Sequence, residues 1–226
     1  MIRPCLASAR LAALLATLLI PACAPRVPLE MLGPGGQVAR PEGMSRDAWT
    51  NALVAYRRAT LDGHTSSTRL TVIDYSLPST SKRLWVVDLA TGEVLAHEYV
   101  AHGAGSGGVW ATVFSNVAGS NRSSLGTFVT AGRSYRGVRG LSLRLRGLEP
   151  GINDRAWERA LVIHGTPGVS EARARAGRMG RTQGCPAVSP AAARQIIPLI
   201  EGGTVVYIWY PDPRLLLGSQ FLAVSR

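Results

Sequence analysis

The apolar residues of the chain first recur at the spacing of an α-helix. Ser45 can cap a helix, and Trp49 and Tyr56 then lie on one face together with several alanines. Gly63 ends this pattern, since glycine readily adopts the backbone conformation that terminates helices. The sequence therefore predicts one amphipathic helix from about 46 to 61.

Beyond this helix the alternation of apolar and polar residues changes to a period of two, which is typical of β-strands. A turn at 90–93 separates two such runs and predicts a hairpin. Long stretches rich in glycine and serine, notably 103–126, lie between other runs. The strands expected from this pattern are Leu70–Tyr75, Arg83–Leu89, Val94–Ala101, Gly126–Thr130, Leu141–Arg146, Leu161–His164 and Thr204–Tyr210.

A second helix is expected between the last two of these strands. Ser189 followed by Pro190 has the form of an N-cap with proline at the first helical position. Pro198 is expected to distort this helix, because proline lacks the N–H that a helix interior requires. Gly202 and Gly203 are expected to end it.

These patterns divide the chain into five segments and predict a mainly β fold with a few peripheral helices. The segment before the first helix repeats proline and glycine without apolar periodicity, which indicates a linker. The segments are a signal peptide at 1–24, the linker at 25–44, the amphipathic helix at 45–63, the mainly β domain at 64–212 and a C-terminal tail at 213–226.

The N-terminal segment has the features of an export signal. Arg3 and Arg10 supply positive charge, and Leu11–Ile20 is an apolar stretch too short to span a bilayer. Cleavage before Cys23 would give a lipoprotein acylated on that sulfur, whereas cleavage at the small residues Ala22–Ala24 would give an ordinary secreted chain. Both alternatives place the protein outside the cytoplasm, in the periplasm or cell envelope.

The chain is strongly basic, with a formal net charge of +11, and Lys82 is its only lysine. A charge of this kind favours an anionic partner, such as a wall polymer with carboxylates or anionic lipid headgroups. Nucleic acid is not expected as a partner, because an exported chain has no access to it and the sequence lacks a basic-aromatic recognition motif.

Cys185 is the only cysteine left to perform chemistry in the folded domain. The other two, Cys5 and Cys23, belong to the leader and its cleavage site. A lone thiol in an oxidising compartment requires a reason to be present. Burial as a small hydrophobic residue is the simplest reason, but the polar, glycine-rich surroundings of Cys185 favour a nucleophile.

His164 is the expected base for this nucleophile. It follows the apolar run Ala160–Ile163 and precedes Gly165, which places it at the exit of a buried strand. A cysteine nucleophile needs a neighbour that accepts its proton. Pro186 cannot donate a hydrogen bond to a developing oxyanion, so the expected donors are the backbone N–H groups of Cys185 and Gly184.

Two other kinds of chemistry are weaker alternatives. Ser106 lies between glycines as in a serine hydrolase elbow, but no strand leads into it. His102 could join His164 and Cys185 around a zinc ion, but the close ligand spacing of zinc sites is missing. Asp154 and Glu158 precede the His164 strand and could orient a base, but solvated acids of a helical turn are the simpler interpretation.

The pattern His164-Gly165 followed by Thr182-Gln183-Gly184-Cys185 resembles the signature of L,D-transpeptidase (YkuD-like) catalytic domains. The similarity is closest to the murein L,D-transpeptidase catalytic domain family and covers about 65–210. It implies an L,D-transpeptidase-like β-sandwich or barrel. Supporting stretches are Ile73–Ser76, Arg83–Leu89, Ala101–Gly107, Phe114–Asn116, Ser123–Gly126 and Gly180–Val188.

The resemblance implies that Cys185 attacks the third residue of a peptidoglycan tetrapeptide stem, releases D-alanine and passes the acyl group to an amine of a second stem. In this scheme His164 is the base, oriented by the carbonyl of Gly165, and no cofactor or metal is required. Peptidoglycan stem peptides are then the expected partners, together with the membrane if Cys23 carries a lipid anchor. The residues expected to contact substrate are His102, Ser124, Arg181 and Gln183.

One position departs from the family pattern. Gln183 stands where the Ser/Thr-His-Gly-Cys block of the family has histidine. That histidine is not the base, so the reaction can survive its loss, but the acceptor of the acyl group is left open. The alternatives are an L,D-carboxypeptidase or cross-link-trimming hydrolase that uses water, and a wall-binding lipoprotein with a degenerate site.

Overall fold

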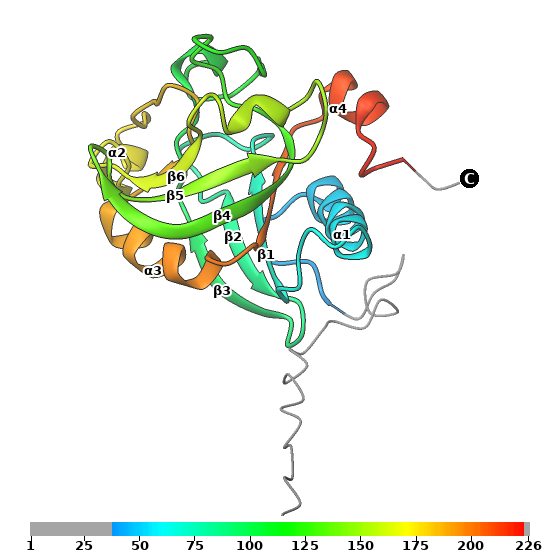
Figure 1. Ribbon diagram of the computed structural model, residues 1–226. Helices are drawn as coiled ribbons and strands as arrows, with labels where there is room; N and C mark the ends of the chain where they lie inside the picture. Colours follow the sequence, from blue (N-terminus) through cyan, green and yellow to red (C-terminus); the bar gives the residue numbers. More distant parts are fainter. Residues whose placement is uncertain (1–37, 224–226) are drawn as a thin grey trace, which may run out of the picture.

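The computed structural model describes residues 38–223 (Figure 1). The expected signal peptide, Cys23 and most of the expected linker lie outside the described residues. Among the helices within 38–223, none has both the length and the apolar character needed to cross a membrane.

One strongly curved sheet of eight strands forms the centre of the protein, and helices lie around it (Figure 1). This arrangement confirms the mainly β fold with peripheral helices. The order across the sheet is β3-β2-β1-β8-β4-β5-β6-β7. The strands are β1 (Arg69–Asp74), β2 (Leu84–Asp88), β3 (Glu93–Glu98), β4 (Gly126–Gly137), β5 (Gly140–Gly147), β6 (Val162–Gly165), β7 (Ala187–Val188) and β8 (Val205–Trp209).

The two ends of the sheet meet at a single pair of residues. Ala101, just beyond β3, pairs with Ala187 of β7 in antiparallel fashion. The Ala101 N–H donates to the Ala187 carbonyl at 2.7 Å, and the reciprocal bond is 3.3 Å long. This isolated bridge brings the two ends of the nearly closed sheet together, so that β7 has a neighbour on both sides.

Helix α1 (Arg46–Leu61) confirms the predicted amphipathic helix. The Ser45 side chain accepts a hydrogen bond from the Ala48 N–H at 3.1 Å, which caps the first turn. Gly63 follows the helix with φ of +74°, a conformation that glycine adopts without steric cost. The alanine-rich buried face packs on β1 and β8, and small side chains allow this close approach.

The β4–β5 hairpin is longer than the sequence pattern predicted. The expected strand ended at Thr130, whereas β4 continues to Gly137 and turns into β5 at Gly140. An irregular register between Ala131 and Tyr135 interrupts the alternation that marks a strand. The outer half of the hairpin is largely exposed, so no apolar face signalled it in the sequence.

Helix α3 (Pro190–Ile200) connects β7 to β8 and packs on β5 and β6. Ser189 caps it by accepting from the Ala192 N–H at 3.1 Å, as the sequence indicated. The helix continues for two residues beyond Pro198, which lies in its last turn. Gly202 and Gly203 then have φ of +83° and +91°, and the helix has ended.

Two short helices were not expected from the sequence. Helix α2 (Glu171–Arg175) lies between β6 and β7, and α4 (Pro213–Gly218) lies in the segment expected as a tail. The Asp212 side chain caps α4 by accepting from the Arg214 N–H at 2.8 Å. Leu215 and Phe221 are buried in the main core, so this segment is part of the packed domain.

Candidate active site

Cys185 lies at the end of a short loop that hydrogen bonds to the Thr182 side chain hold in a turn. The Thr182 hydroxyl donates to the Cys185 carbonyl at 2.7 Å and accepts from the Gly184 N–H at 3.1 Å. Gly184 has φ of +120°, and a Cβ built there would lie 2.7 Å from the Arg122 carbonyl oxygen. Only glycine fits this position. Because the Gly184 N–H already donates to Thr182, the Cys185 N–H is the one of the two predicted oxyanion donors that is left for substrate.

The Cys185 thiol is buried, with a relative exposure of 4% for the residue. Its Sγ donates to the Ala160 carbonyl at 4.0 Å. Ala160 has φ of +53°, a left-handed conformation that is unusual for a residue with a Cβ. This turn directs its carbonyl toward the sulfur at the point where the chain enters β6.

The pKa of the Cys185 thiol is raised, because burial disfavours the charged thiolate. A backbone hydrogen bond from Val162 and the positive charges of three arginines oppose this effect. The free thiol is therefore protonated at neutral pH, and the surroundings already hold charges that stabilise the thiolate once it forms. The three arginines are Arg139, Arg144 and Arg159.

His164 lies near the end of β6 and pairs with Ala187, two residues beyond Cys185. Its Nδ1 is 3.0 Å from the Gly165 carbonyl oxygen, which can only accept. Nδ1 therefore carries the proton, and Nε2 has the free lone pair. Burial lowers the pKa of His164, and the charge of Arg139 lowers it further, so the ring is neutral at pH 7.

His164 and Cys185 thus occupy neighbouring segments, but no hydrogen bond joins them within residues 38–223. The His164 Nε2 is buried and has no hydrogen-bond partner among the described residues. The thiol donates to Ala160 instead. Catalytic hydrogen bonds are often absent or long before substrate binds, and both groups are in the neutral forms that a thiol and its general base require.

Gly165 has a second structural role in addition to its carbonyl contact with His164. A Cβ built on it would lie 3.0 Å from the Pro190 Cα and 3.1 Å from the Ala193 Cβ. The absence of a side chain lets the first turn of α3 approach β6 closely. Helix α3 therefore supports the strand that holds the His164 ring.

Arg159 is a site residue that the sequence reasoning missed. Its guanidinium donates to the Ser115 carbonyl at 2.7 Å, to the Ser124 Oγ at 2.5 Å and to the Arg122 carbonyl at 2.6 Å. It thereby ties the 115–124 loop to the segment beside Cys185. Its only sequence signal was its position just before the His164 strand.

Ser124, predicted to contact substrate, is instead held inside this loop. Its side chain accepts from Arg159 and donates to the Ser115 carbonyl at 2.9 Å, and the residue is 2% exposed. These contacts use the hydroxyl for loop structure. The structure therefore places Ser124 behind the surface that a substrate would meet.

His102, also predicted to contact substrate, is 1% exposed and belongs to a buried polar cluster. The Arg83 guanidinium donates to its Nδ1 at 2.8 Å, so the ring is neutral with its proton on Nε2. Burial and then the charge of Arg83 lower the His102 pKa to about 4. Arg83 also donates to the Leu77 and Val100 carbonyls, and burial lowers its own pKa to about 10. His102 therefore supports the 103–126 loop from inside the protein.

The other two predicted substrate residues are exposed. Arg181 makes one long contact, from Nη1 to the Gly107 carbonyl at 3.4 Å. Gln183 accepts through Oε1 from the Arg139 Nη2 at 2.8 Å. Arg139 comes from the tip of the β4–β5 hairpin, so Gln183 connects that hairpin to the loop of the nucleophile.

A cleft of about 490 Å³ lies beside His164. The end of β6 forms one wall, the β4–β5 hairpin a second, and the start of α3 a third. Its volume suits part of a peptide. The residues that line it are Arg136, Val138, Arg139, Gly140, Leu141, His164, Gly165, Thr166, Pro167, Pro190, Ala193 and Arg194.

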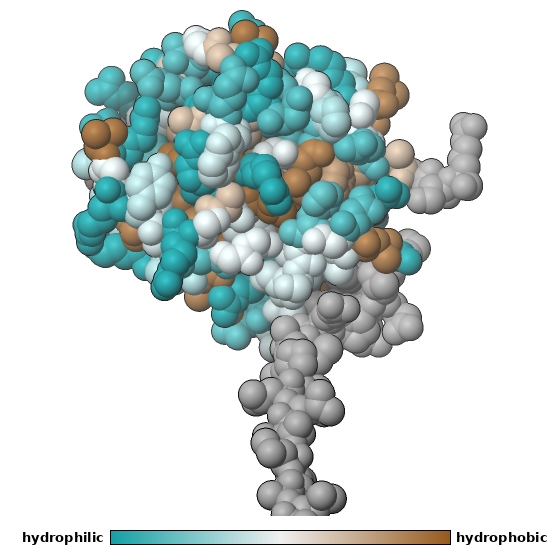
Figure 2. All heavy atoms as spheres, viewed as in Figure 1, coloured by the Kyte–Doolittle hydropathy of each residue, from teal (hydrophilic) through white to brown (hydrophobic). Residues whose placement is uncertain are grey.

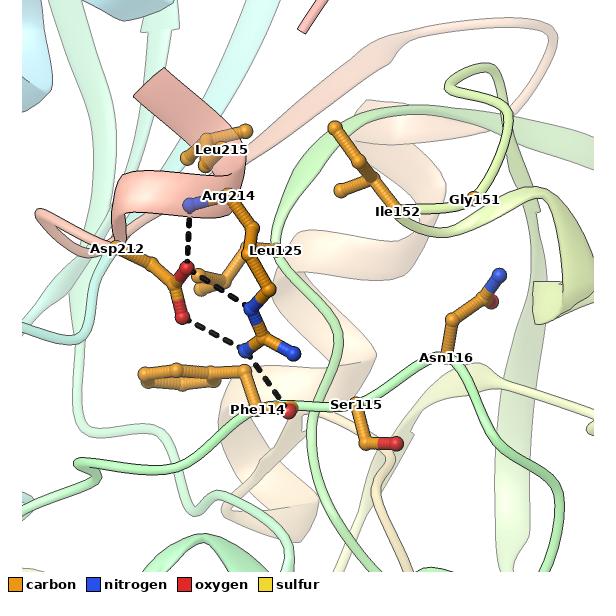
Figure 3. Close-up of a pocket in the computed structure, with 9 residues that line it drawn as sticks. All are labelled: Phe114, Ser115, Asn116, Leu125, Gly151, Ile152, Asp212, Arg214 and Leu215. Carbon is orange, nitrogen blue, oxygen red and sulfur yellow. Dashed lines mark hydrogen bonds and ion pairs between the residues drawn. The ribbon is translucent and has the colours of Figure 1, made fainter. Parts of the chain in front are cut away.

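A second pocket, of only about 50 Å³, lies where α4 meets the 114–116 segment (Figure 3). Arg214 donates to both carboxylate oxygens of Asp212, at 3.1 and 2.8 Å, and to the Phe114 carbonyl at 3.1 Å. These bonds anchor α4 to the body of the protein. Neither Cys185 nor His164 lines this pocket, and its size suits a water molecule rather than a peptide.

The weaker alternatives find no matching geometry. Ser106 is fully buried and its Oγ accepts from the Ser123 N–H at 2.9 Å, as part of the loop structure. Asp154 accepts from Asn116, and Glu158 pairs with Arg155 on the surface, as solvated acids of a turn do. In residues 38–223, no three His, Cys, Asp or Glu side chains gather as metal ligands do.

Comparison with known proteins identifies the family. The chain matches the model of the L,D-transpeptidase catalytic domain over residues 40–209. This match covers most of the sequence, and the chain belongs to that family. No curated protein sequence matches the chain.

Solved structures give distant similarities. An L,D-transpeptidase from Mycobacterium smegmatis is 15% identical, with a TM-score of 0.40 over 65% of this chain and 60% of that one. L,D-transpeptidase 1 of Mycobacterium tuberculosis is 13% identical, with a TM-score of 0.38 over 65% and 63% of the two chains. The helical cell shape determining protein of Campylobacter jejuni is 12% identical, with a TM-score of 0.41 over 67% and 54%. This chain thus spans less than two thirds of each of these proteins.

Proposed function

We propose that this protein is a cysteine-dependent peptidoglycan L,D-transpeptidase that works through an acyl-enzyme. Membership of the L,D-transpeptidase catalytic domain family supports the reaction class. The single observation that carries the assignment of residues is the state of His164. Its Nδ1–H is fixed by Gly165, which leaves Nε2 unpartnered beside the segment that bears Cys185.

In the first half of the proposed reaction, the thiol leaves the Ala160 carbonyl and gives its proton to His164 Nε2. The sulfur attacks the carbonyl carbon of the third residue of a tetrapeptide stem, and the electron pair moves to the carbonyl oxygen. The Cys185 N–H donates to that oxyanion. When the oxyanion collapses, the bond to the terminal D-alanine breaks, and His164 returns the proton to the leaving amine.

In the second half, the side-chain amine of another stem attacks the thioester carbonyl and gives a proton to His164. The carbon–sulfur bond breaks, the thiolate regains a proton from His164, and a cross-link between third residues remains. Water in place of the amine would give a tripeptide. The partly polar, open cleft beside His164 leaves room for an acceptor.

Incubation of the full-length protein with disaccharide-tetrapeptide, followed by mass spectrometry, tests this proposal. A cross-linked dimer supports transfer, tripeptide alone supports the hydrolase alternative, and no turnover by the wild type contradicts both. Cys185→Ala should abolish either product. Cys23→Ala replaces a cysteine outside the catalytic domain and is the matched control; it should leave turnover in detergent solution unchanged.

We also propose that the protein is exported and held at the cell envelope by a lipid on Cys23. The basic start of the chain, the apolar run 11–20 and the cysteine at the expected cleavage site support this proposal. Growth with radiolabelled palmitate should label the wild type but not Cys23→Ser. Label on neither protein, with both proteins shortened at the N-terminus and released in soluble form, would support an ordinary cleaved signal instead.

A further inference from the structure

Three arginines face the cleft beside His164. Arg136 and Arg139 come from the β4–β5 hairpin, and Arg194 comes from α3. No acidic residue lines the cleft. None of the ion pairs found in residues 38–223 includes any of the three. The viewed face of the molecule is largely hydrophilic, with small separate apolar patches (Figure 2).

Three guanidinium groups around one cleft repel each other, so their joint presence favours an anion between them. The planar guanidinium fork matches the two oxygens of a carboxylate. The other walls carry small or apolar side chains such as Leu141, Pro167 and Ala193, which suit the body of a peptide. The cleft therefore has the composition of a site for a peptide with a free carboxylate.

Arg139 is the cleft arginine that is hydrogen-bonded to the nucleophile loop. Its charge acts on both the His164 ring and the Cys185 thiol. Its Nη2 donates to the Oε1 of Gln183, which stands two residues before Cys185. This hydrogen bond attaches the guanidinium to the loop that carries the nucleophile, while His164 lines the same cleft as Arg139.

The hydrogen-bond partner of Arg139 is the neutral side chain of Gln183, so a charged group of a ligand can compete with it. A carboxylate carries the opposite charge to a guanidinium and can accept two parallel hydrogen bonds from it, whereas the Gln183 amide oxygen is neutral. An entering carboxylate can therefore take Arg139 from Gln183, which otherwise holds the side chain in place. The terminal carboxylate of a tetrapeptide lies one residue, about 4 Å, beyond the scissile carbonyl.

We propose that Arg139, with Arg136 and Arg194 behind it, binds the free C-terminal carboxylate of the residue that the enzyme releases. The site would thereby select stems that end one residue after the scissile bond. This inference rests on the proposed function, because it places the scissile carbonyl at Cys185. This role falls to Arg139 and not to Arg181, which is expected to contact substrate but does not line the cleft.

The experiment compares a synthetic tetrapeptide stem ending in D-alanine as the free acid and as the C-terminal amide. Wild-type protein should prefer the acid by about 10- to 100-fold in kcat/KM, the range expected for a charge-assisted hydrogen bond. Arg139→Gln should lose this preference and Arg139→Lys should keep part of it. Arg133→Gln makes the same charge change on the same hairpin, outside the cleft lining, and should retain the full preference.

Binding of the same two peptides to Cys185→Ala protein, measured by calorimetry, separates this inference from the proposed function. Tighter binding of the acid than of the amide, abolished by adding Arg139→Gln, supports the carboxylate site even if the wild type turns over neither peptide. Equal binding of acid and amide, or a preference that survives Arg139→Gln, overturns it even if the protein is an active transpeptidase.

Discussion

Replacing Arg159 by glutamine tests how the 115–124 loop is held against the nucleophile. In the wild type one charged group donates three hydrogen bonds, to Ser115, Ser124 and Arg122, and the change removes at least two of them. Bonds of this kind contribute about 1.5–3 kcal/mol each, but the three share one partly exposed side chain and do not add in full. Glutamine can also keep one of them. We expect a loss of about 2 kcal/mol, which corresponds to about 4–8 °C in Tm for a domain of this size.

Thermal unfolding followed by circular dichroism measures the stability, and hydrogen exchange measures the protection of the 115–124 amides. Arg155→Gln is the matched control, because Arg155 is an exposed arginine of the same turn that pairs only with exposed Glu158. It should leave Tm nearly unchanged. Loss of the Arg159 charge should also raise the pKa of the Cys185 thiol. Arg159→Lys keeps the charge but not the three hydrogen bonds, so it should restore the thiol pKa more fully than it restores Tm. Unchanged Tm and unchanged exchange in Arg159→Gln would refute this account of the loop.

Three further predictions concern the nucleophile loop, the base and the core. Gly184→Ala should lower Tm and abolish turnover, because its Cβ would meet the Arg122 carbonyl at 2.7 Å and φ is +120°; Gly108→Ala has open space around it and is the thermal-unfolding control. The acid limb of the kcat/KM pH profile should fall below pH 6.5, because burial lowers the pKa of His164 and only its neutral ring accepts a proton; a limb above 6.5 would assign the base elsewhere. Glu149→Gln should raise Tm at pH 7 but change it little at pH 4, because burial raises the pKa of this carboxyl, so its charged form costs stability only above about pH 4.5; equal Tm differences at both pH values would contradict this.

The local patterns of the sequence were sufficient for the elements that bury one face. The Ser45 cap and the alanine face predicted α1 to within a residue, and the apolar run before His164 predicted β6. The outer half of the β4–β5 hairpin was missed because it buries little and contains an irregular register. Helix α4 was missed although Asp212-Pro213 repeats the cap-and-proline signal of Ser189-Pro190.

The candidate active site could be predicted only for residues whose type and sequence position indicate a catalytic role. Cys185 and His164 stood out as a lone thiol and a histidine at a strand exit, and their catalytic roles stay predictions. The contacts of Arg159 span 35–44 residues of chain, so no local pattern could indicate them. For the same reason the sequence did not indicate the burial of His102 and Ser124, because His102 bonds to Arg83 and Ser124 bonds to Arg159, both on other segments.

The pairing of Ala101 with Ala187 also affects how a partner chain can approach the nucleophile. Strand β7 has hydrogen-bonding neighbours on both sides, β6 and Ala101, although it is the last strand in the order of the sheet. A peptide therefore cannot lengthen the sheet by adding a strand beside β7. For the same reason another protein chain cannot aggregate by pairing with this strand. Recognition at this point of the molecule must depend on side chains and loop amides rather than on continuous main-chain pairing.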